Sequence, residues 1–226
     1  NKIDHIFHLG ACSKTTEPDR DYIMDVNFNY SKKLLEHSAN NNIDMIYASS
    51  ASVYGDGTIF KEDTDNESSL NHYSESKLLF DNYVRENITR IKSQIVGMRY
   101  FNVYGPREPL KGQYAPVVGL FKRMKESGEK LTIVGDGDQR RDFTYIKDVV
   151  RANMMAAESK VYHGLFNIGT GRNYSINQVA DFVGGEKTYI PSRSGEARET
   201  MADISKATQI LGWSPIHKLE KTIGEY

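Results

Sequence analysis

The first half of the chain alternates between short apolar runs and longer segments that repeat apolar residues on one helical face. The apolar runs, at residues 3–9, 43–48 and 93–100, are bounded by polar or small residues, which is typical of buried strands. Helical spacing of apolar residues extends from residue 19 or 20 to 38 and over residues 73–84, while residues 55–69 are polar and turn-rich. This alternation predicts an α/β fold with a parallel sheet covered by helices.

Beyond about residue 105 the pattern changes. Loops rich in glycine and proline separate shorter elements. The patterns predict helices over residues 117–125, 146–158, 176–183 and 222–226, and strands over residues 130–134 and 165–168. We therefore expect residues 106–226 to form mainly a smaller mixed lobe, with some elements returning to the sheet formed by residues 1–105.

Composition and charge narrow the functional class. In 226 residues, 29 Lys and Arg balance 30 Asp and Glu, and the resulting net charge of −1 argues against a general binder of nucleic acid or membrane surfaces. No apolar run is long enough to cross a membrane. The single cysteine, Cys12, excludes an internal disulfide and favours a reducing compartment, so we expect a cytoplasmic location. Neither CxxC nor HExxH occurs, so no metal site is predicted.

The strongest candidate for chemistry is the segment from Tyr73 to Lys77 on a predicted helix. Four residues are about one helical turn, so the two side chains share a face. An ammonium group beside a phenol lowers the phenol pKa from about 10, which lets the tyrosine accept a proton from a substrate hydroxyl. The same spacing is common on ordinary solvated helices, so the pair gains weight only from its surroundings.

Small and polar residues follow each of the predicted strands. The first strand is followed by Gly10, Ala11, Cys12 and Ser13, the second ends in a run that contains Ser50, and the third ends within residues 99–108. One such run can be a simple turn that lets the chain leave the sheet. Several of them at the carboxyl edge of one parallel sheet, where ligands bind in open α/β folds, favour the close approach of a flat cofactor.

These segments resemble the extended short-chain dehydrogenase/reductase family of nucleotide-sugar epimerases and dehydratases, and the resemblance covers nearly the whole chain. It implies a catalytic set of Ser50, Tyr73 and Lys77. The implied contacts to the dinucleotide are Gly10, Ala11, Cys12, Ser13, Asn27, Tyr73, Lys77 and Val103. The implied contacts to the nucleotide sugar are Asn102, Arg141, Arg193 and Glu196. Arg141 lies in a segment similar to the family's Arg-Asp-Phe signature and would grip the diphosphate; ordinary surface charge is the alternative for these arginines.

Two subfamilies share the resemblance. Residues 8–17, 30–35, 77–81 and 93–108 are similar to ADP-glycero-manno-heptose 6-epimerases, in which Lys111 would be a second catalytic base; an exposed loop lysine is the alternative. Residues 112–118, 135–139 and 195–200 look more like UDP-hexose 4-epimerases. The resemblance therefore implies an epimerase that uses NAD or NADP and leaves the sugar and the nucleotide open.

A Gly-rich turn of the GxGxxG or GxxGxxG type, which holds the pyrophosphate in a dinucleotide-binding fold, does not occur in the sequence. If residues 3–9 form the family's fourth strand, three strands and their helices belong before residue 1, and the first of them lies beside the fourth. We therefore expect the biological protein to be longer by several tens of residues. In the present chain we expect an exposed apolar strand edge that aggregates or pairs with another chain.

The expected fold is thus a Rossmann-like doubly wound parallel sheet without its N-terminal strands, plus a small mixed α/β substrate lobe. The expected function is that of an NAD(P)-dependent nucleotide-sugar epimerase, with a nucleotide-diphosphate sugar as substrate and a homo-oligomer formed through the helices after Asp19 and Tyr73. A nucleotide-sugar 4,6-dehydratase is one alternative, although Ala51 and Ser52 stand where that chemistry uses an acidic pair in this family. A non-catalytic, truncated sugar-nucleotide-binding fragment is the other.

Overall fold

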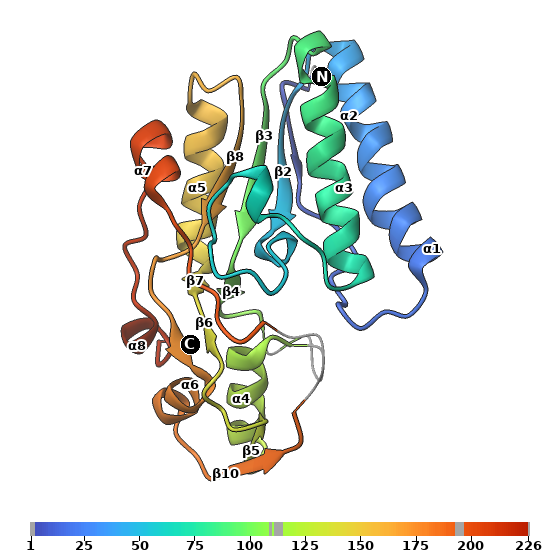
Figure 1. Cartoon of the computed structure of the whole chain (residues 1–226). Helices are drawn as coiled ribbons and strands as arrows, with labels where there is room; N and C mark the ends of the chain where they lie inside the picture. Colours follow the sequence, from blue (N-terminus) through green and yellow to red (C-terminus); the bar gives the residue numbers. More distant parts are fainter. Residues whose placement is uncertain (1–2, 109, 111–114, 193–196, 226) are drawn as a thin grey trace.

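A computed structural model of the chain describes residues 3–108, 110, 115–192 and 197–225. At its centre is a four-stranded parallel sheet with the order β1-β2-β3-β8 (Figure 1). The strands are β1 (His5–His8), β2 (Asp44–Ser50), β3 (Ile95–Tyr100) and β8 (His163–Ile168). The three apolar runs of the first half form adjacent strands, as predicted, and the fourth strand comes from the second half.

Helices cover both faces of this sheet, because successive residues of a strand point to opposite sides. Met45 and Tyr47 of β2 belong to a core shared with two helices on one face, whereas Ile46 packs with a third helix on the other face. The first face carries α1 (Arg20–Ile23), a π-helical segment (Met24–Asn29), α2 (Tyr30–Asn41) and α3 (His72–Asn87), and the second carries α5 (Ile146–Glu158). The predicted α/β architecture is confirmed.

The start of α3 is fixed by a cap that the sequence supplies. Asn71 accepts a hydrogen bond from the backbone N–H of Ser74 at 2.9 Å, and the Ser74 hydroxyl accepts one from the Asn71 backbone N–H at 3.1 Å. Tyr73 consequently lies in the first turn of the helix. Lys77, one turn later, is buried on the face that packs against the sheet.

The second lobe has a core of its own, visible in the lower half of Figure 1. Helices α4 (Val117–Glu126) and α6 (Ile176–Val183) pack against β5 (Leu131–Val134), which pairs in parallel with β10 (Lys187–Ile190). Because each helix has one strongly apolar face, the two can bury that face against each other and against β5. The predicted helices at 117–125, 146–158 and 176–183 are all observed, the last two with the same bounds.

Short strand pairs connect the lobe to the edge of the main sheet. The parallel pair is β4 (Asn102–Tyr104) with β7 (Phe143–Tyr145), and the antiparallel pair is β6 (Arg140–Arg141) with β9 (Tyr174–Ser175). The other helices of the described residues are α7 (Ser205–Leu211), α8 (Leu219–Thr222) and three 3-10 turns at Ala51–Val53, Thr64–Asn66 and Ile88–Arg90. In the part of the chain described, no helix is long and apolar enough to cross a membrane.

The C-terminal helix differs from its prediction. α8 ends at Thr222, and Ile223 and Gly224 form a turn, so the predicted helix over residues 222–226 is wrong for the described residues. The Thr222 hydroxyl bonds the Lys218 carbonyl and the Tyr104 hydroxyl, and Ile223 is buried in the core of the lobe. Tertiary contacts and the low helix propensity of glycine end the helix there.

Strand β1 lies at one edge of the sheet and, among the described residues, pairs only with β2. The side chains of Phe7 and Leu9 are 40% and 50% exposed. A groove of about 620 Å³ follows this edge between β1, the loop after it and the helix opposite, with Ile6, Val26 and Leu34 among its lining residues. The exposed apolar edge that the sequence predicts is therefore present.

Candidate functional site

The predicted catalytic residues meet at the carboxyl edge of the sheet. Ser50 is the last residue of β2, and its hydroxyl accepts hydrogen bonds from the backbone and the hydroxyl of Ser52 at 3.2 and 2.9 Å. The first turn of α3 brings Tyr73 to the same place, where the Ser50 hydroxyl lies close enough to oppose the rise in the Tyr73 pKa that burial causes. The small residues after β2 make a tight 3-10 turn at Ala51–Val53, which leaves room for the helix to approach.

Lys77 joins this pair from the next turn of α3. Its ammonium nitrogen donates a hydrogen bond to the Ala48 carbonyl at 2.8 Å and lies 5.9 Å from the centre of the Tyr73 ring. The side chain is only 6% exposed, and this burial lowers its pKa from 10.5 to about 8, against the opposing charge of Asp81. The structure thus brings Ser50, Tyr73 and Lys77 together.

The electrostatics of Tyr73 differ from the expectation. The spacing of Tyr73 and Lys77 suggests a phenol whose pKa is lowered by the ammonium group. Here burial raises the pKa of Tyr73 above its usual 10, and the nearby Ser50 only partly opposes that rise. The physical reason is the burial of the phenol, which disfavours its charged form. Lys77 directs its ammonium to the Ala48 carbonyl of β2.

The burial of Lys77 predicts a pH dependence of stability. An unfolded lysine titrates near 10.5 and the folded one near 8, so between these values the unfolded state binds more protons and the free energy of unfolding rises with pH. Relative to Lys77→Met, we expect wild type to gain up to about 3 kcal/mol between pH 7.5 and 10.5, measured by urea unfolding. Relative to the exposed Lys33→Met, wild type should show no such gain, because both proteins retain Lys77. If the difference in stability between wild type and Lys77→Met did not change with pH, the pKa shift of Lys77 would be contradicted.

The loop that follows β1 is held against α3 by one amide. Asn27, in the π-helical segment, accepts a hydrogen bond from the Cys12 N–H at 2.8 Å and donates to the Cys12 carbonyl at 3.0 Å and the Ser76 hydroxyl at 3.1 Å. An extra residue in a π turn redirects side chains and often marks a functional site. Asn27 therefore holds the loop of Gly10, Ala11, Cys12 and Ser13 beside Ser76, the residue that precedes Lys77 in α3.

This edge fits the nicotinamide end of a dinucleotide. A side-chain carbon added at Gly10 would meet no atom within 4 Å, so the loop leaves open space beside it. Val103, also predicted to contact the cofactor, lies half-buried in β4. Tyr73 and Lys77 supply a hydroxyl and an ammonium group, which are the donors that a ribose diol requires.

The residues predicted to bind the nucleotide sugar are only partly placed. Asn102 begins β4, and its backbone N–H bonds the Asp142 carbonyl at 3.0 Å. Arg141 lies in β6 and donates to the carbonyls of Arg140 at 2.9 Å and Arg198 at 3.4 Å. Lys111, Arg193 and Glu196 lie outside the described residues, so their roles stay predictions.

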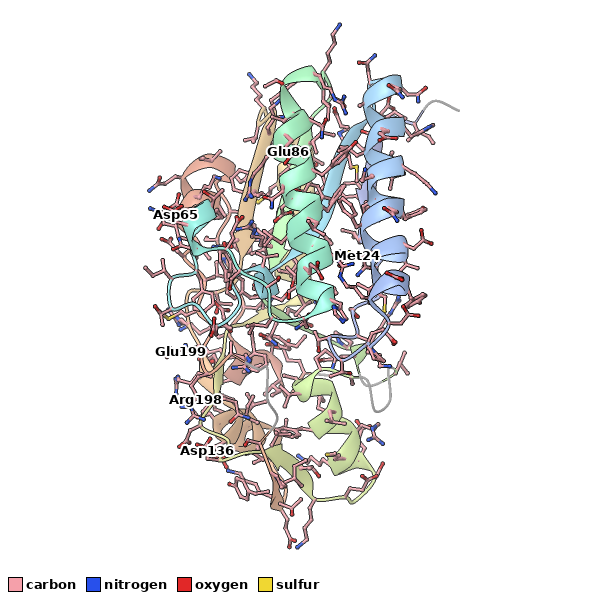
Figure 2. The ribbon with its side chains drawn as sticks, turned by 45° about the vertical axis from the view of Figure 1, so that its right-hand side comes forward. Met24, Asp65, Glu86, Asp136, Arg198 and Glu199 are labelled. Atoms are coloured by element: carbon pink, nitrogen blue, oxygen red, sulfur yellow. The ribbon has the colours of Figure 1, made fainter. Side chains whose placement is uncertain are left out.

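Near Arg141, an exposed ion pair joins Arg198 to Asp136 at 2.9 Å, as Figure 2 shows on the second lobe. This pair and the backbone bonds of Arg140 with Arg198 and Thr200 hold residues 198–200 on the lobe. In the described ranges, no three His, Cys, Asp or Glu side chains converge to hold a metal ion.

Sequence reasoning missed a buried ionic network behind helix α3. Asp81 and Arg99 are both fully buried, and Arg99 donates to Asp81 Oδ2 at 2.9 and 3.1 Å. Arg99 also bonds Glu67, which pairs with Arg85. The available signal was spacing: Asp81 follows Tyr73 and Lys77 by two turns and one turn on the same face of α3.

A second residue missed by sequence reasoning is Asp142, which fastens loops of the second lobe. Its buried carboxylate accepts hydrogen bonds from Thr170, by both its backbone and its hydroxyl, from the Gly171 N–H and from the Ala202 N–H, all between 2.7 and 3.1 Å. Burial raises the pKa of Asp142, and these donors oppose that rise. The carboxylate thus joins three segments that are far apart in sequence.

Replacing this carboxylate by an amide should weaken the lobe. In Asp142→Asn, one acceptor oxygen becomes an NH₂ group facing buried N–H donors, and we expect a loss of about 2–4 kcal/mol in the free energy of unfolding. The measurement is urea unfolding followed by circular dichroism. Asp65→Asn, at an exposed site (Figure 2), is the matched control and should leave the midpoint unchanged. Equal stability of Asp142→Asn and wild type would contradict the role of Asp142.

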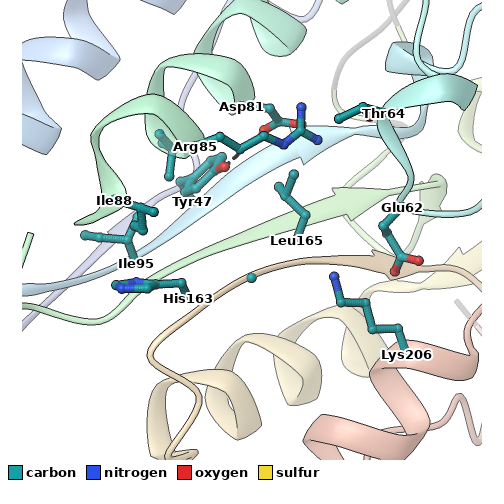
Figure 3. A pocket seen from close by; sticks show the side chains of 12 residues that line it. Tyr47, Glu62, Thr64, Asp81, Arg85, Ile88, Ile95, His163, Leu165 and Lys206 are labelled. Carbon is teal, nitrogen blue, oxygen red and sulfur yellow. Dashed lines mark hydrogen bonds between the residues drawn. The ribbon is translucent and has the colours of Figure 1, made fainter. Parts of the chain in front are cut away.

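A cavity of about 240 Å³ lies between α3, the strands β3 and β8, and α7 (Figure 3). Tyr47, Asp81 and Arg85 line one side, and Glu62 and Lys206 lie across from them. The cavity borders the ionic network beside α3, because Asp81 and Arg85 belong to both.

Comparison with known proteins identifies the family to which the chain is similar. Residues 1–169 match the model of the NAD dependent epimerase/dehydratase family. The chain is 45% identical over 200 residues to ADP-L-glycero-D-manno-heptose-6-epimerase of Alkalilimnicola ehrlichii, covering 84% of this chain and 62% of the relative. It is 47% identical over 215 residues to the enzyme of the same name from Thiobacillus denitrificans, covering 92% of this chain and 63% of the relative. The chain thus spans a little over three fifths of the length of these relatives.

Solved structures agree in fold. The structure of ADP-L-glycero-D-manno-heptose-6-epimerase from Helicobacter pylori matches with a TM-score of 0.87 at 33% identity, over 99% of this chain and 71% of that one. UDP-glucose 4-epimerase from Thermotoga maritima, solved with UDP-glucose, matches with a TM-score of 0.89 at 31% identity, over 97% of this chain and 74% of that one. The fold is therefore the Rossmann-like α/β fold of these epimerases, and the chain belongs to the NAD dependent epimerase/dehydratase family.

Proposed function

We propose that the protein is a nucleotide-sugar epimerase of the ADP-heptose 6-epimerase type that uses NAD or NADP. The observation that carries this proposal is the meeting of Ser50, Tyr73 and Lys77 at the carboxyl edge of the sheet, beside the loop after β1. Similarity to heptose epimerases over 84–92% of the chain supports the sugar class, because it extends through the second lobe.

In this mechanism Tyr73 exchanges a proton with the sugar hydroxyl whose carbon is oxidised. Ser50, beside Tyr73, orients that hydroxyl, and Lys77 supplies positive charge close to the phenol. When bound, NAD or NADP supplies the acceptor and later the donor of hydride. The resulting keto-sugar is reduced on its opposite face, and Tyr73 or a second base such as Lys111 returns the proton.

Substrate contacts are proposed by position. Asn102, at the start of β4, would bond the sugar nucleotide, and Arg141, with its planar guanidinium, would bind the diphosphate in a bidentate manner. Arg193 and Glu196 complete this set as predictions from the sequence. A UDP-hexose is the second candidate substrate, because UDP-glucose 4-epimerase of Thermotoga maritima has the same fold over 97% of this chain.

The test follows deuterium through the reaction. The purified protein is incubated with NAD or NADP and ADP-glycero-manno-heptose deuterated at C6, with UDP-glucose deuterated at C4 in parallel, and products are resolved by NMR. Because hydride leaves and returns within one active site, we expect an inverted C6 that retains deuterium in H₂O. Inversion of UDP-glucose alone would assign the second substrate class. Washout of deuterium, or no inversion of either sugar together with no dinucleotide released on denaturation, would overturn the epimerase proposal.

A further inference from the structure

Helix α3 presents a third side chain to β2 beyond the catalytic pair. Tyr73, Lys77 and Asp81 are spaced by four residues, so they lie on one face of the helix. Asp81 is fully buried, and the proposed chemistry does not use it. Its Oδ1 accepts a hydrogen bond from the Tyr47 hydroxyl at 3.1 Å, and its Oδ2 accepts one from the Ser49 hydroxyl at 2.9 Å (Figure 3 shows Tyr47 and Asp81).

These two donors flank the residue that holds the catalytic lysine. Tyr47 and Ser49 are the neighbours of Ala48 in β2, and Ala48 O is the acceptor of the Lys77 ammonium. Ala48 also follows the last β2 residue that pairs with β1, since His8 is opposite Tyr47. At this position β2 is held by its pairing with β3 in the sheet and by the contacts of Tyr47 and Ser49 with Asp81 of α3.

We call the two hydrogen bonds from Tyr47 and Ser49 to Asp81 the β2 clamp. The surroundings of Asp81 keep this clamp rigid. Arg99 of β3 donates two further hydrogen bonds to the carboxylate, both to Oδ2. Gly97 lies opposite Tyr47 in β3, and a side-chain carbon added there would stand 2.5 Å from the Tyr47 ring. Only glycine at this position leaves the ring room to reach Asp81.

We propose that Asp81 is a positioning residue that, through Tyr47 and Ser49, sets the Ala48 carbonyl and thereby the placement of the Lys77 ammonium relative to Tyr73. The inference rests on the proposed epimerase function and adds to it a residue that touches neither substrate nor cofactor. The ionisable groups that face Asp81 are Arg99 from β3, Tyr47 from β2, and Lys77 and Arg85 from α3, with Glu67 beyond Arg99.

The experiment reads Lys77 directly, so it does not depend on turnover. In protein labelled with ¹³C-lysine, the Lys77 ¹³Cε resonance, assigned by its loss in Lys77→Met, is titrated in wild type, Asp81→Asn and Glu86→Gln. Glu86 is an exposed acid on the same helix (Figure 2) and serves as the matched control. We expect the pKa of Lys77 to fall by roughly one in Asp81→Asn, because a nearby negative charge is removed, and to stay unchanged in Glu86→Gln.

A second variant separates the clamp from the ion pair. Tyr47→Phe combined with Ser49→Ala removes both strand contacts and retains Asp81 with Arg99, so it keeps the proposal testable if Asp81→Asn does not fold. We expect a lower Lys77 pKa here too, and a kcat about tenfold below wild type with KM within about twofold. A folded double variant with the wild-type Lys77 pKa and kcat would overturn the positioning role. If the wild-type protein were inactive but the Lys77 pKa still changed in these variants, the result would count against the epimerase proposal alone.

Discussion

Tyr73→Phe is expected to lower kcat for the nucleotide-sugar substrate by about 10²–10⁴-fold, because it removes the hydroxyl that we propose exchanges a proton with the sugar. Binding should change little, since the phenyl ring retains the packing of Tyr73 in the first turn of α3. The measurement is initial-rate kinetics with NAD or NADP present, together with substrate Kd by calorimetry.

The matched control is Tyr83→Phe on the same helix. Its hydroxyl donates to Glu36 on the outer surface, where α2 and α3 meet, far along α3 from Ser50. Tyr83→Phe should retain wild-type kcat. If Tyr73→Phe turned over at the rate of Tyr83→Phe, Tyr73 would not be the proton acceptor, and another base would have to be sought at this edge.

Arg99→Met should give the largest loss of stability in the protein. Arg99 is fully buried and donates to Asp81, Glu67 and the Tyr54 hydroxyl. Methionine fills much of the volume but leaves the buried Asp81 without its Arg99 partner and Glu67 with Arg85 alone. Removing one partner of a buried ion pair costs about 3–5 kcal/mol, and we expect a decrease of that size in the free energy of unfolding.

Urea unfolding followed by circular dichroism measures this loss. The control is Lys130→Ala, which breaks the solvent-exposed pair of Lys130 with Glu186 and should leave the unfolding midpoint nearly unchanged. An Arg99→Met protein as stable as Lys130→Ala would mean that the network around Asp81 contributes little to holding α3 on the sheet. In that case contacts other than Arg99 would have to hold Asp81 against Tyr47 and Ser49 of β2.

Local sequence patterns predicted most of the helices and strands. The helix over residues 146–158 has its predicted bounds because its apolar and polar faces are clearly separated, and such a face needs only one partner surface to be buried. Tyr73 and Lys77 were found because their spacing is set by the helix itself. Small residues at the end of a parallel strand predicted the ligand edge of the sheet, and the family resemblance singled out Ser50 within them.

Contacts between remote segments were not predictable in the same way. Asp142 bonds residues 28 and 60 positions away, and Arg99 reaches Asp81, Glu67 and Tyr54 from three different elements. The predicted C-terminal helix was wrong for a related reason: Thr222 is held by Tyr104, which lies 118 residues earlier. No local periodicity encodes such partners.

The sequence by itself thus determined the parallel strands and the helices between them, because each depends on spacing within one element. The residues proposed to carry the chemistry stay predictions. Only the tertiary structure decided the direction of the pKa shifts of Tyr73 and Lys77, the grip of Asn27 on the loop after β1, and the pairing of Asp81 with β2. These properties depend on burial and on distances between elements, and both are set only when the helices pack on the sheet.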